Sequence, residues 1–229
     1  MNYVLIGDIH SQAKNLENAL SFIRKNISNA KVIFLGDIFD SKTKYSDSYS
    51  VYSLIREAER DLNAVILQSN HQDKLIRHLR GNKVHINTGL QRSLDELLKI
   101  LSMDELYNWL IRHPYGIVFR DAFHNEFRCA HAYFSSEVQV YDYLESYYVR
   151  AISKEHIHQF LYGIQDSYKN RINWWDNDNK SQRFIRVAGH YRKIYTNLSN
   201  KSLVLDSCCG EDKGLLSIYD VNERRIYQF

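Results

Sequence analysis

The amino-acid sequence predicts a mixed α/β (α+β) fold with two β-sheets in the core and a helical insertion in the middle of the chain. Two patterns carry this prediction. The first half alternates short apolar runs with stretches of helical periodicity, which favours parallel strands joined by helical crossovers. The last quarter returns to short apolar runs separated by turn residues, a pattern typical of antiparallel strands. At 229 residues with 44% hydrophobic side chains, we expect one domain, residues 1–229, with a substantial core.

Three strands are predicted in the first half, at residues 3–8, 31–37 and 63–70. Each is a run of apolar residues, and the first two end in the pair Gly-Asp. The segments between them, 13–26 and 50–62, repeat apolar residues at helical spacing and therefore predict helices. Strands that alternate with helices in this way lie parallel, because each helix returns the chain to the same edge of the sheet.

The middle of the chain predicts a helical insertion at about residues 93–120, in which Pro114 ends the helix because proline lacks the N–H that a helix needs. A second helical stretch is predicted at about 138–162. The apolar runs that close the chain are expected to pair antiparallel through short turns and to form the second sheet. These runs are residues 184–190, 202–209, 215–220 and 224–229.

Composition excludes several classes of protein. A formal net charge of +3 is too small for tight, non-specific binding to nucleic acid, which enters only as a possible substrate. No apolar run approaches the roughly 18 residues needed to span a bilayer, so we expect no membrane partner. The N-terminus lacks a basic leader, and the three cysteines form no disulfide framework, so we expect a cytoplasmic protein without a signal peptide.

One local charge bias stands out. Residues 169–201 contain eight basic residues against two acidic ones. This is the pattern of a solvated basic face or of a site for an anionic substrate, and composition leaves both open.

Ligand-type side chains recur where the predicted apolar strands end. Because the carboxyl ends of strands face one crevice in an open α/β sheet, these side chains are expected to converge in space. In "GDIH" the residues Asp8 and His10 lie two apart, on the same face of an extended chain. Oxygen and imidazole ligands without thiolate suit Mn, Fe, Zn or Ni. The full set is Asp8, His10, Asp37, Asp40, Asn70, His71, His131, His190 and Asp206.

Each of these features also has an ordinary structural explanation. Gly-Asp after a strand is commonly a turn or a helix cap, and a single histidine is usually hydrogen-bonded in the core or at the surface. The recurrence at five strand ends is what favours a site. Trp174 and Trp175 are expected to pack in the core or under a lid, and Cys208 and Cys209 to be small buried residues. The remaining histidines are assigned to the surface: His78, His85, His113, His124, His156 and His158.

The motif series "GDIH", "GDIFD", "SNHQDKL", "CAHA" and "AGH" resembles, in order, that of the calcineurin-like metallophosphoesterases. Within them it is most similar to the phosphoprotein-phosphatase branch, especially bacterial diadenosine tetraphosphate hydrolases and the phosphatase domain of bacterial RNA-repair kinase-phosphatases. The resemblance covers nearly the whole chain. It implies a four-layer β-sandwich flanked by helices and a centre of two divalent metal ions, manganese first, with Fe, Zn, Ni or Mg as the alternatives.

The resemblance also implies a role for each motif residue. The expected ligands are Asp8 and His10 for the first metal, Asp37 bridging both, and Asn70, His131 and His190 for the second. A shared carboxylate holds two ions roughly 3.5–4 Å apart in such centres, and a hydroxide between them attacks the phosphorus. His71 is expected to be the general acid that protonates the leaving oxygen, with Asp40 orienting its imidazole.

The sequence departs from the family pattern in the second motif. "GDIFDSK" has Ser41 and Lys42 where the pattern continues Arg-Gly, so the arginine that clamps phosphate oxygens is missing. Lys42 or Lys44 is a candidate replacement, although lysine lacks the bidentate fork of arginine. Arg171 and Arg192 are further candidates for substrate binding. A diester or anhydride carries less charge per phosphate than a monoester, so the loss of one arginine favours such substrates.

The expected function is therefore a metal-dependent phosphoesterase. Its substrate classes are phosphodiesters, nucleotides or other phosphorylated small molecules, dinucleoside polyphosphates, and phosphoserine or phosphothreonine in proteins. The alternative is a non-catalytic scaffold that retains the fold. The intact ligand set favours the enzyme, because a scaffold has no need to keep it.

Overall fold

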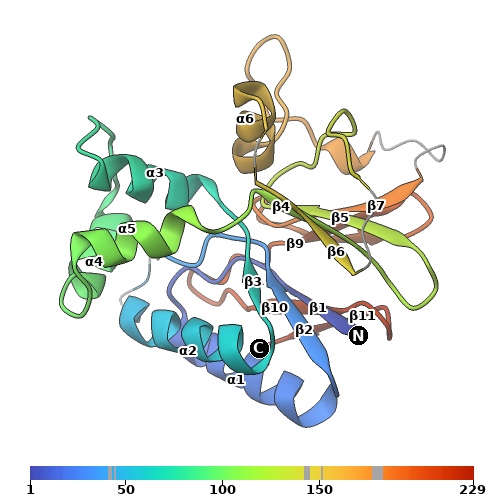
Figure 1. Ribbon diagram of the computed structural model, residues 1–229, viewed down its shortest axis with the longest axis horizontal. Helices are drawn as coiled ribbons and strands as arrows, with labels where there is room; N and C mark the ends of the chain where they lie inside the picture. The colour runs from blue at the N-terminus through green and yellow to red at the C-terminus, as the bar shows by residue number, and fades with distance from the viewer. Residues whose placement is uncertain (41–42, 44, 142–144, 151, 177–182) are drawn as a thin grey trace.

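The computed structural model describes residues 1–229 apart from 41–42, 44, 142–144, 151 and 177–182. Two β-sheets pack face to face in the centre, and helices cover their outer sides (Figure 1). This arrangement confirms the α/β class with two sheets. Among the described residues, no helix is both long and apolar enough to cross a membrane.

The first sheet has five strands in the order β11-β10-β1-β2-β3. Its strands are β1 (Asn2–Ile6), β2 (Ala30–Phe34), β3 (Val65–Ile66), β10 (Ser217–Asp220) and β11 (Arg225–Gln228). Strands β1, β2 and β3 are parallel and are connected through α1 (Ala13–Asn26) and α2 (Ser48–Asp61), as the alternating pattern predicts.

Two of the closing strands lie in a different sheet from the one predicted. Strands β10 and β11 form an antiparallel hairpin that joins the first sheet, where β10 pairs with β1. Strand β10 lies between β1 and β11, with Ile218 paired to Ile6 of β1, and all four residues of β10 are buried. A run that is buried on both faces fits the interior of a sheet, which the apolar pattern alone does not assign.

The second sheet has six strands in the order β6-β4-β5-β7-β9-β8. They are β4 (Gly116–Arg120), β5 (Glu126–Ala130), β6 (Ser146–Val149), β7 (Phe184–Ala188), β8 (Ile194–Asn197) and β9 (Ser202–Leu205). Strand β7 runs parallel to β5 and β9, whereas the other neighbours are antiparallel. The expectation of purely antiparallel pairing is therefore wrong for β7.

Two predicted helical stretches contain strands. Residues 116–120 form β4, because Ile117 and Phe119 face one core layer and Val118 faces another, a period of two. In the stretch 138–162, residues 146–149 form β6 on the edge of the same sheet, and only α6 (Lys154–Tyr162) is helical. The aromatic and β-branched residues of β6 suit a strand better than a helix.

The core consists of layers that follow the alternation of the strands. Leu5 of β1 packs between the sheets with Ile117, while Val4 and Ile6 face the helices on the other side. Outside the second sheet, Phe160 of α6 packs on Val118. Helices, sheet, sheet and α6 make four layers, as the family resemblance implies.

The helical insertion consists of short helices with side-chain caps. They are α3 (Asn70–Leu79), α4 (Thr88–Leu97) and α5 (Met103–Ile111). Helix α4 packs beside α2, and α3 packs against α4 and α5 (Figure 1). Ser69, Asn87 and Ser102 accept hydrogen bonds from the first turns, which satisfies N–H groups that have no partner inside the helix. The insertion thus ends before Pro114, and α4 begins earlier than predicted.

Candidate active site

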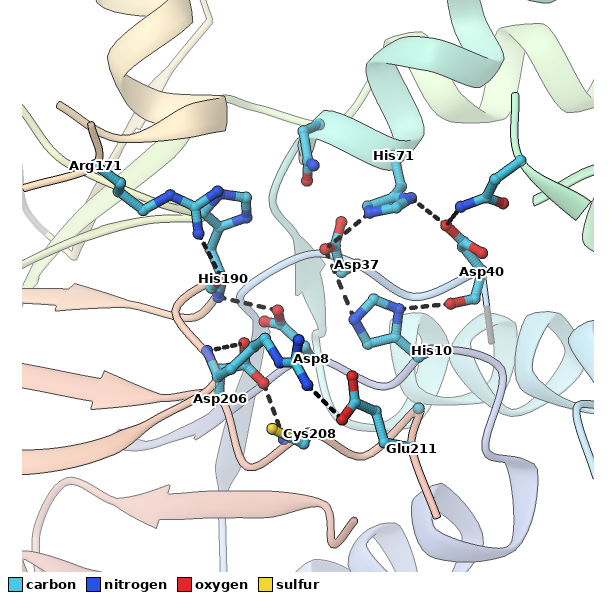
Figure 2. Close-up of a pocket in the computed structure, with 14 residues that line it drawn as sticks. Asp8, His10, Asp37, Asp40, His71, Arg171, His190, Asp206, Cys208 and Glu211 are labelled. Carbon is cyan, nitrogen blue, oxygen red and sulfur yellow. Dashed lines mark hydrogen bonds and ion pairs between the residues drawn. The ribbon is translucent and has the colours of Figure 1, made fainter. Parts of the chain in front are cut away.

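The segments that follow β1, β2, β3, β7 and β9 meet at a cavity of about 240 Å³ (Figure 2). Asp8 follows β1, Asp37 follows β2, and His190 follows β7. His71 is the second residue of α3, directly after the short strand β3. Parallel strands present their carboxyl ends at one edge, which is why residues far apart in the sequence converge here.

The carboxylate of Asp37 lies at the centre of a cluster of three histidine side chains. Its Oδ2 atom is 3.4 Å from His131 Nε2, 3.7 Å from His71 Nε2 and 3.8 Å from His10 Nε2. Two groups of possible metal ligands share this residue: Asp8, His10 and Asp37 form one, and Asp37, His131 and His190 form the other. In each group the ligand atoms lie within 4.8 Å of one another.

Hydrogen bonds to the main chain orient two of the imidazoles. His131 Nδ1 donates to Leu35 O at 3.0 Å, and His10 Nδ1 donates to Asp40 O at 2.7 Å. In the neutral rings, Nε2 then carries the lone pair. His131 Nε2 lies 3.0 Å from the amide oxygen of Asn70. Either a proton on Nε2 or a metal ion can join two acceptor atoms at that distance, and with neutral imidazole the donor set fits a metal ion.

Buried polar atoms without a partner support the same conclusion. Among the described residues, Asp8 Oδ1, Asp37 Oδ1 and His190 Nε2 have no hydrogen-bond partner. Burial, together with the charges of Asp206 and Asp37, raises the pKa of Asp8 well above its usual range. A divalent cation would remove this repulsion and give the free oxygen a partner.

The pKa values of Asp37 and His190, two further possible ligands, are shifted in directions that suit a metal site. Burial raises the pKa of Asp37, but the charges of His131 and His71 outweigh it and hold that pKa well below the usual range. Burial, followed by the charge of His131, lowers the pKa of His190 well below its usual value. His190 is therefore neutral, which is the form of imidazole that binds metals.

The backbone around these residues is strained. Four of them have positive φ angles: His10 at 49°, Asp37 at 41°, Asp40 at 76° and His190 at 64°. Such conformations cost about 1–3 kcal/mol each and persist only where the surrounding structure imposes them. Packing here leaves little freedom, because a Cβ atom on Gly189 would overlap the carboxylate of Asp8.

His71 and Asp40 form a pair on the side of the cavity opposite His190 (Figure 2). His71 Nδ1 lies 2.6 Å from Asp40 Oδ2, and Asn87 Nδ2 donates to the same oxygen at 2.7 Å. Burial lowers the pKa of His71, but the charges of Asp37 and Asp40 outweigh it and raise that pKa. Burial raises the pKa of Asp40, and the hydrogen bond and charge of His71 lower it further than burial raises it. Both shifts favour the charged forms, a protonated imidazole beside a carboxylate.

The two arginines predicted to bind substrate both line the cavity but have different surroundings. Arg171 donates to His190 O at 3.5 Å, and within the described part of the chain no carboxylate lies at ion-pair distance from it. Arg192 Nη2 lies 2.5 Å from Glu211 Oε2, and its backbone N–H donates to Asp206. Lys42, the third candidate, lies outside the described residues.

The motifs do not predict several of the residues that line the cavity. Asn87, Cys208, Gly210 and Glu211 line it without belonging to a recognised motif. Asp206 lines the cavity as well, where it accepts hydrogen bonds from the backbone N–H groups of Arg192 and Cys208. Asn87 begins the sequence "NTG", and an asparagine before a helical pattern is a signal for an N-cap. The neighbouring sequence does not indicate that Asn87 contacts Asp40.

Three predictions about residues outside the motifs have clear outcomes. His113 is buried rather than at the surface, and it packs edge-on against Trp109. Cys208 is half-buried, whereas Cys209 is buried as expected. Trp174 and Trp175 are core residues that pack against the outer face of the second sheet.

The sequence profile of one known family, described as calcineurin-like phosphoesterase, matches residues 1–202. The chain belongs to this family. A calcineurin-like phosphoesterase is a hydrolase, and its family uses metal ions, in agreement with the buried Asp and His groups. Membership therefore favours the enzyme over the non-catalytic scaffold.

Individual relatives of this calcineurin-like phosphoesterase include phosphatases with different substrates. The chain is similar to the asymmetrical bis(5′-nucleosyl)-tetraphosphatase PrpE of Oceanobacillus iheyensis, with 30% identity over 123 residues. That match covers 50% of this chain and 47% of the relative, so the chain spans about half the length of the curated relative it matches.

Solved structures support the fold. One is a protein assigned as a diadenosine tetraphosphatase, with a TM-score of 0.64 at 18% identity, covering 100% of this chain and 92% of that one. Another is a cold-active protein-tyrosine phosphatase of a Shewanella species, with a TM-score of 0.55 at 15% identity, covering 99% and 80%. At these identities the likeness concerns the fold alone.

Proposed function

We propose that this protein hydrolyses phosphate esters or anhydrides at a centre of two divalent metal ions, with manganese as the first candidate. The observation that carries the proposal is the pair of ligand groups that share Asp37, with the His71–Asp40 pair beside them. Asp8 and His10 would hold one ion, and Asn70, His131 and His190 the other. When bound, the two ions would supply an activated water and screen the charge of the phosphoryl group.

The protein groups act on the two ends of the reaction. Arg171 binds a phosphate oxygen, since its guanidinium lines the cavity and no carboxylate of the described residues competes for it. His71 gives its proton to the leaving oxygen, because a departing alkoxide is too basic to leave unprotonated. Asp40 keeps the imidazole in the orientation that directs Nε2 toward the cavity.

The substrate that this pocket suits best carries few charges on the reacting phosphate. Ser41 replaces the expected arginine, and Arg192 is already paired with Glu211, which leaves Arg171 as the guanidinium available to the substrate in the described part of the pocket. A phosphodiester or anhydride therefore fits better than a monoester dianion. Dinucleoside polyphosphates are the specific anhydride candidate, because the chain is similar to PrpE over 123 residues.

A substrate panel with Mn, Ni and Mg tests this proposal. The panel contains bis-nitrophenyl phosphate, nitrophenyl phosphate, diadenosine tetraphosphate, cyclic nucleotides and a phosphopeptide. We expect metal-dependent hydrolysis that is faster for the diester or the anhydride than for the monoesters. A strong preference for nitrophenyl phosphate or the phosphopeptide would contradict the substrate class, and no metal-dependent hydrolysis of any compound would contradict the function itself.

A further inference from the structure

We propose that Asn87, the residue that starts α4, is a positioning residue for the His71–Asp40 pair. This inference rests on the proposed function, since it concerns how that reaction obtains its proton. Asn87 lies in none of the motifs that define the site, yet it lines the cavity and contacts Asp40 directly. The helical insertion would then have a function, which is to hold Asp40 and through it the imidazole of His71.

The helix cap decides which end of the Asn87 amide faces Asp40. Its Oδ1 atom accepts the backbone N–H of Leu90 at 2.8 Å, as the N-cap of α4. A carboxamide has one oxygen and one NH₂ group, so an oxygen committed to the cap directs the NH₂ group away from the helix. Nδ2 then donates to Asp40 Oδ2 at 2.7 Å. Flipping the amide would lose the cap and bring an oxygen against a carboxylate.

Asp40 is held from α4 at two points. The backbone N–H of Asp40 donates to Ser93 Oγ at 3.2 Å, and its side chain receives Asn87. A carboxylate with a single partner rotates about its last side-chain bond, whereas a second donor on the same oxygen fixes the direction of that oxygen. With both contacts in place, Oδ2 points at His71 Nδ1, 2.6 Å away.

The consequence for the reaction is specific to the leaving group. Asp40 fixes the imidazole of His71 in one orientation, with Nε2 toward the centre of the cavity. If Asp40 loses its second donor, the imidazole is oriented correctly for less of the time and proton delivery slows. Leaving groups that need no proton are unaffected. Among the described residues, the hydrogen bonds of Asn87 are to Asp40, Leu90 and Gln91, so metal binding is also unaffected.

Two substitutions separate this function from helix capping. Asn87→Ser keeps a good capping oxygen but is too short to reach Asp40. Asn87→Asp keeps the cap and the shape but replaces the donor by a carboxylate oxygen. Ser153→Ala removes the cap of α6 on the outer side of the second sheet and controls for the loss of a helix cap alone. Each variant is assayed with diesters of an alkyl alcohol and of nitrophenol, and its metal content is measured.

We expect both Asn87 variants to keep their metal content and to lower kcat roughly tenfold for the alkyl diester, with KM and the nitrophenyl rate nearly unchanged. In a His71→Ala background, Asn87→Ser should cause no further loss, because the residue acts through His71. Ser153→Ala should leave both rates unchanged.

The inference is overturned if Asn87→Ser keeps the alkyl rate, slows both substrates equally, or adds its full loss to His71→Ala. A leaving-group-dependent loss in His71→Ala without one in Asn87→Ser contradicts this inference alone. If the unaltered protein hydrolyses no ester and no anhydride, the proposed function fails and this inference fails with it. If it hydrolyses anhydrides but neither diester, this inference alone fails.

Discussion

The two sides of the candidate site are built in different ways. The ligand side, with Asp8, Asp37, His131 and His190, is formed by residues that follow strands of both sheets. The acid side, His71 with Asp40, depends on α3, a loop and the cap of α4. The side chain of His131 is 0% exposed, compared with 17% for His71.

This difference shows how one site combines rigidity with adjustability. Close packing fixes the ligand side, so changes there should remove the proposed metal centre as a whole. Polar contacts from the insertion hold Asp40, and none of them is made directly to a proposed ligand, so we expect changes in them to affect metal binding little. The predictions below test this contrast, beginning with the largest effect.

Asp37→Asn should have the largest effect. It removes the carboxylate shared by both ligand groups, so we expect neither ion to bind stoichiometrically. Activity should fall by about a thousandfold or more, the scale seen when a group needed for charge stabilisation is lost. Metal analysis of the purified variant, together with its hydrolysis rate, measures both effects. A variant that still held two ions would contradict a shared ligand at this position.

His71→Ala should leave the metals in place and slow only reactions with poor leaving groups. Loss of a general acid typically costs about 10²–10⁴-fold, and we expect this range for alkyl esters and little change for nitrophenyl esters. The contrast with Asp37→Asn is measured by metal content, which should be unchanged here. If His71→Ala lost its metals, the separation of the site into two sides would be wrong.

Sequence patterns predict the ligand side well because its signals are local. Asp8 and Asp37 each end an apolar run, and the alternation of such runs with helices predicts β1, β2 and β3 in parallel order. The sheet to which β10 belongs is not local information. It depends on the pairing of residues more than 200 positions apart, such as Val4 with Asp220, which apolar periodicity does not encode.

The acid side was only partly predictable for the same reason. His71 and Asp40 belong to recognisable motifs, but Asn87 contacts Asp40 from 47 positions away and is recognisable only as a helix cap. His113 was assigned to the surface because it falls outside the motifs. It is buried because it fills a space beside Trp109 and accepts from Gln72, whose side chain also bonds the cap of α3.

The buried His113 affects the stability of the folded protein rather than the reaction. Burial, followed by the charges of Arg112 and Arg150, lowers its pKa from 6.5 to about 3. Between these values the unfolded chain binds a proton that the folded protein does not, so stability falls as the pH falls. From about pH 7 to about pH 5, this residue alone should remove roughly 2 kcal/mol from the free energy of unfolding.

His113→Gln keeps an acceptor for Gln72 but does not titrate, so its free energy of unfolding should depend less steeply on pH than that of the unaltered protein. Denaturant unfolding at several pH values measures the slopes, whatever the absolute stability of the variant. His85→Gln, at an exposed position, serves as the matched control and should keep the original slope. Equal slopes for His113→Gln and the control would show that His113 is accessible to protons in the folded protein.

The smallest predicted effect distinguishes the two arginines at the mouth of the cavity. Arg171 has no carboxylate at ion-pair distance among the described residues, whereas Arg192 is paired with Glu211 at 2.5 Å. We expect Arg171→Ala to lower kcat/KM about tenfold, mainly through KM, because a charge-assisted hydrogen bond to phosphate is lost. Arg192→Ala should lower kcat/KM less, because the exposed ion pair already neutralises that charge.

Inhibition by inorganic phosphate provides a second measurement, and this inhibition should weaken more in Arg171→Ala than in Arg192→Ala. The reverse order would mean that the ion pair opens when substrate binds and that Arg192 holds the phosphate.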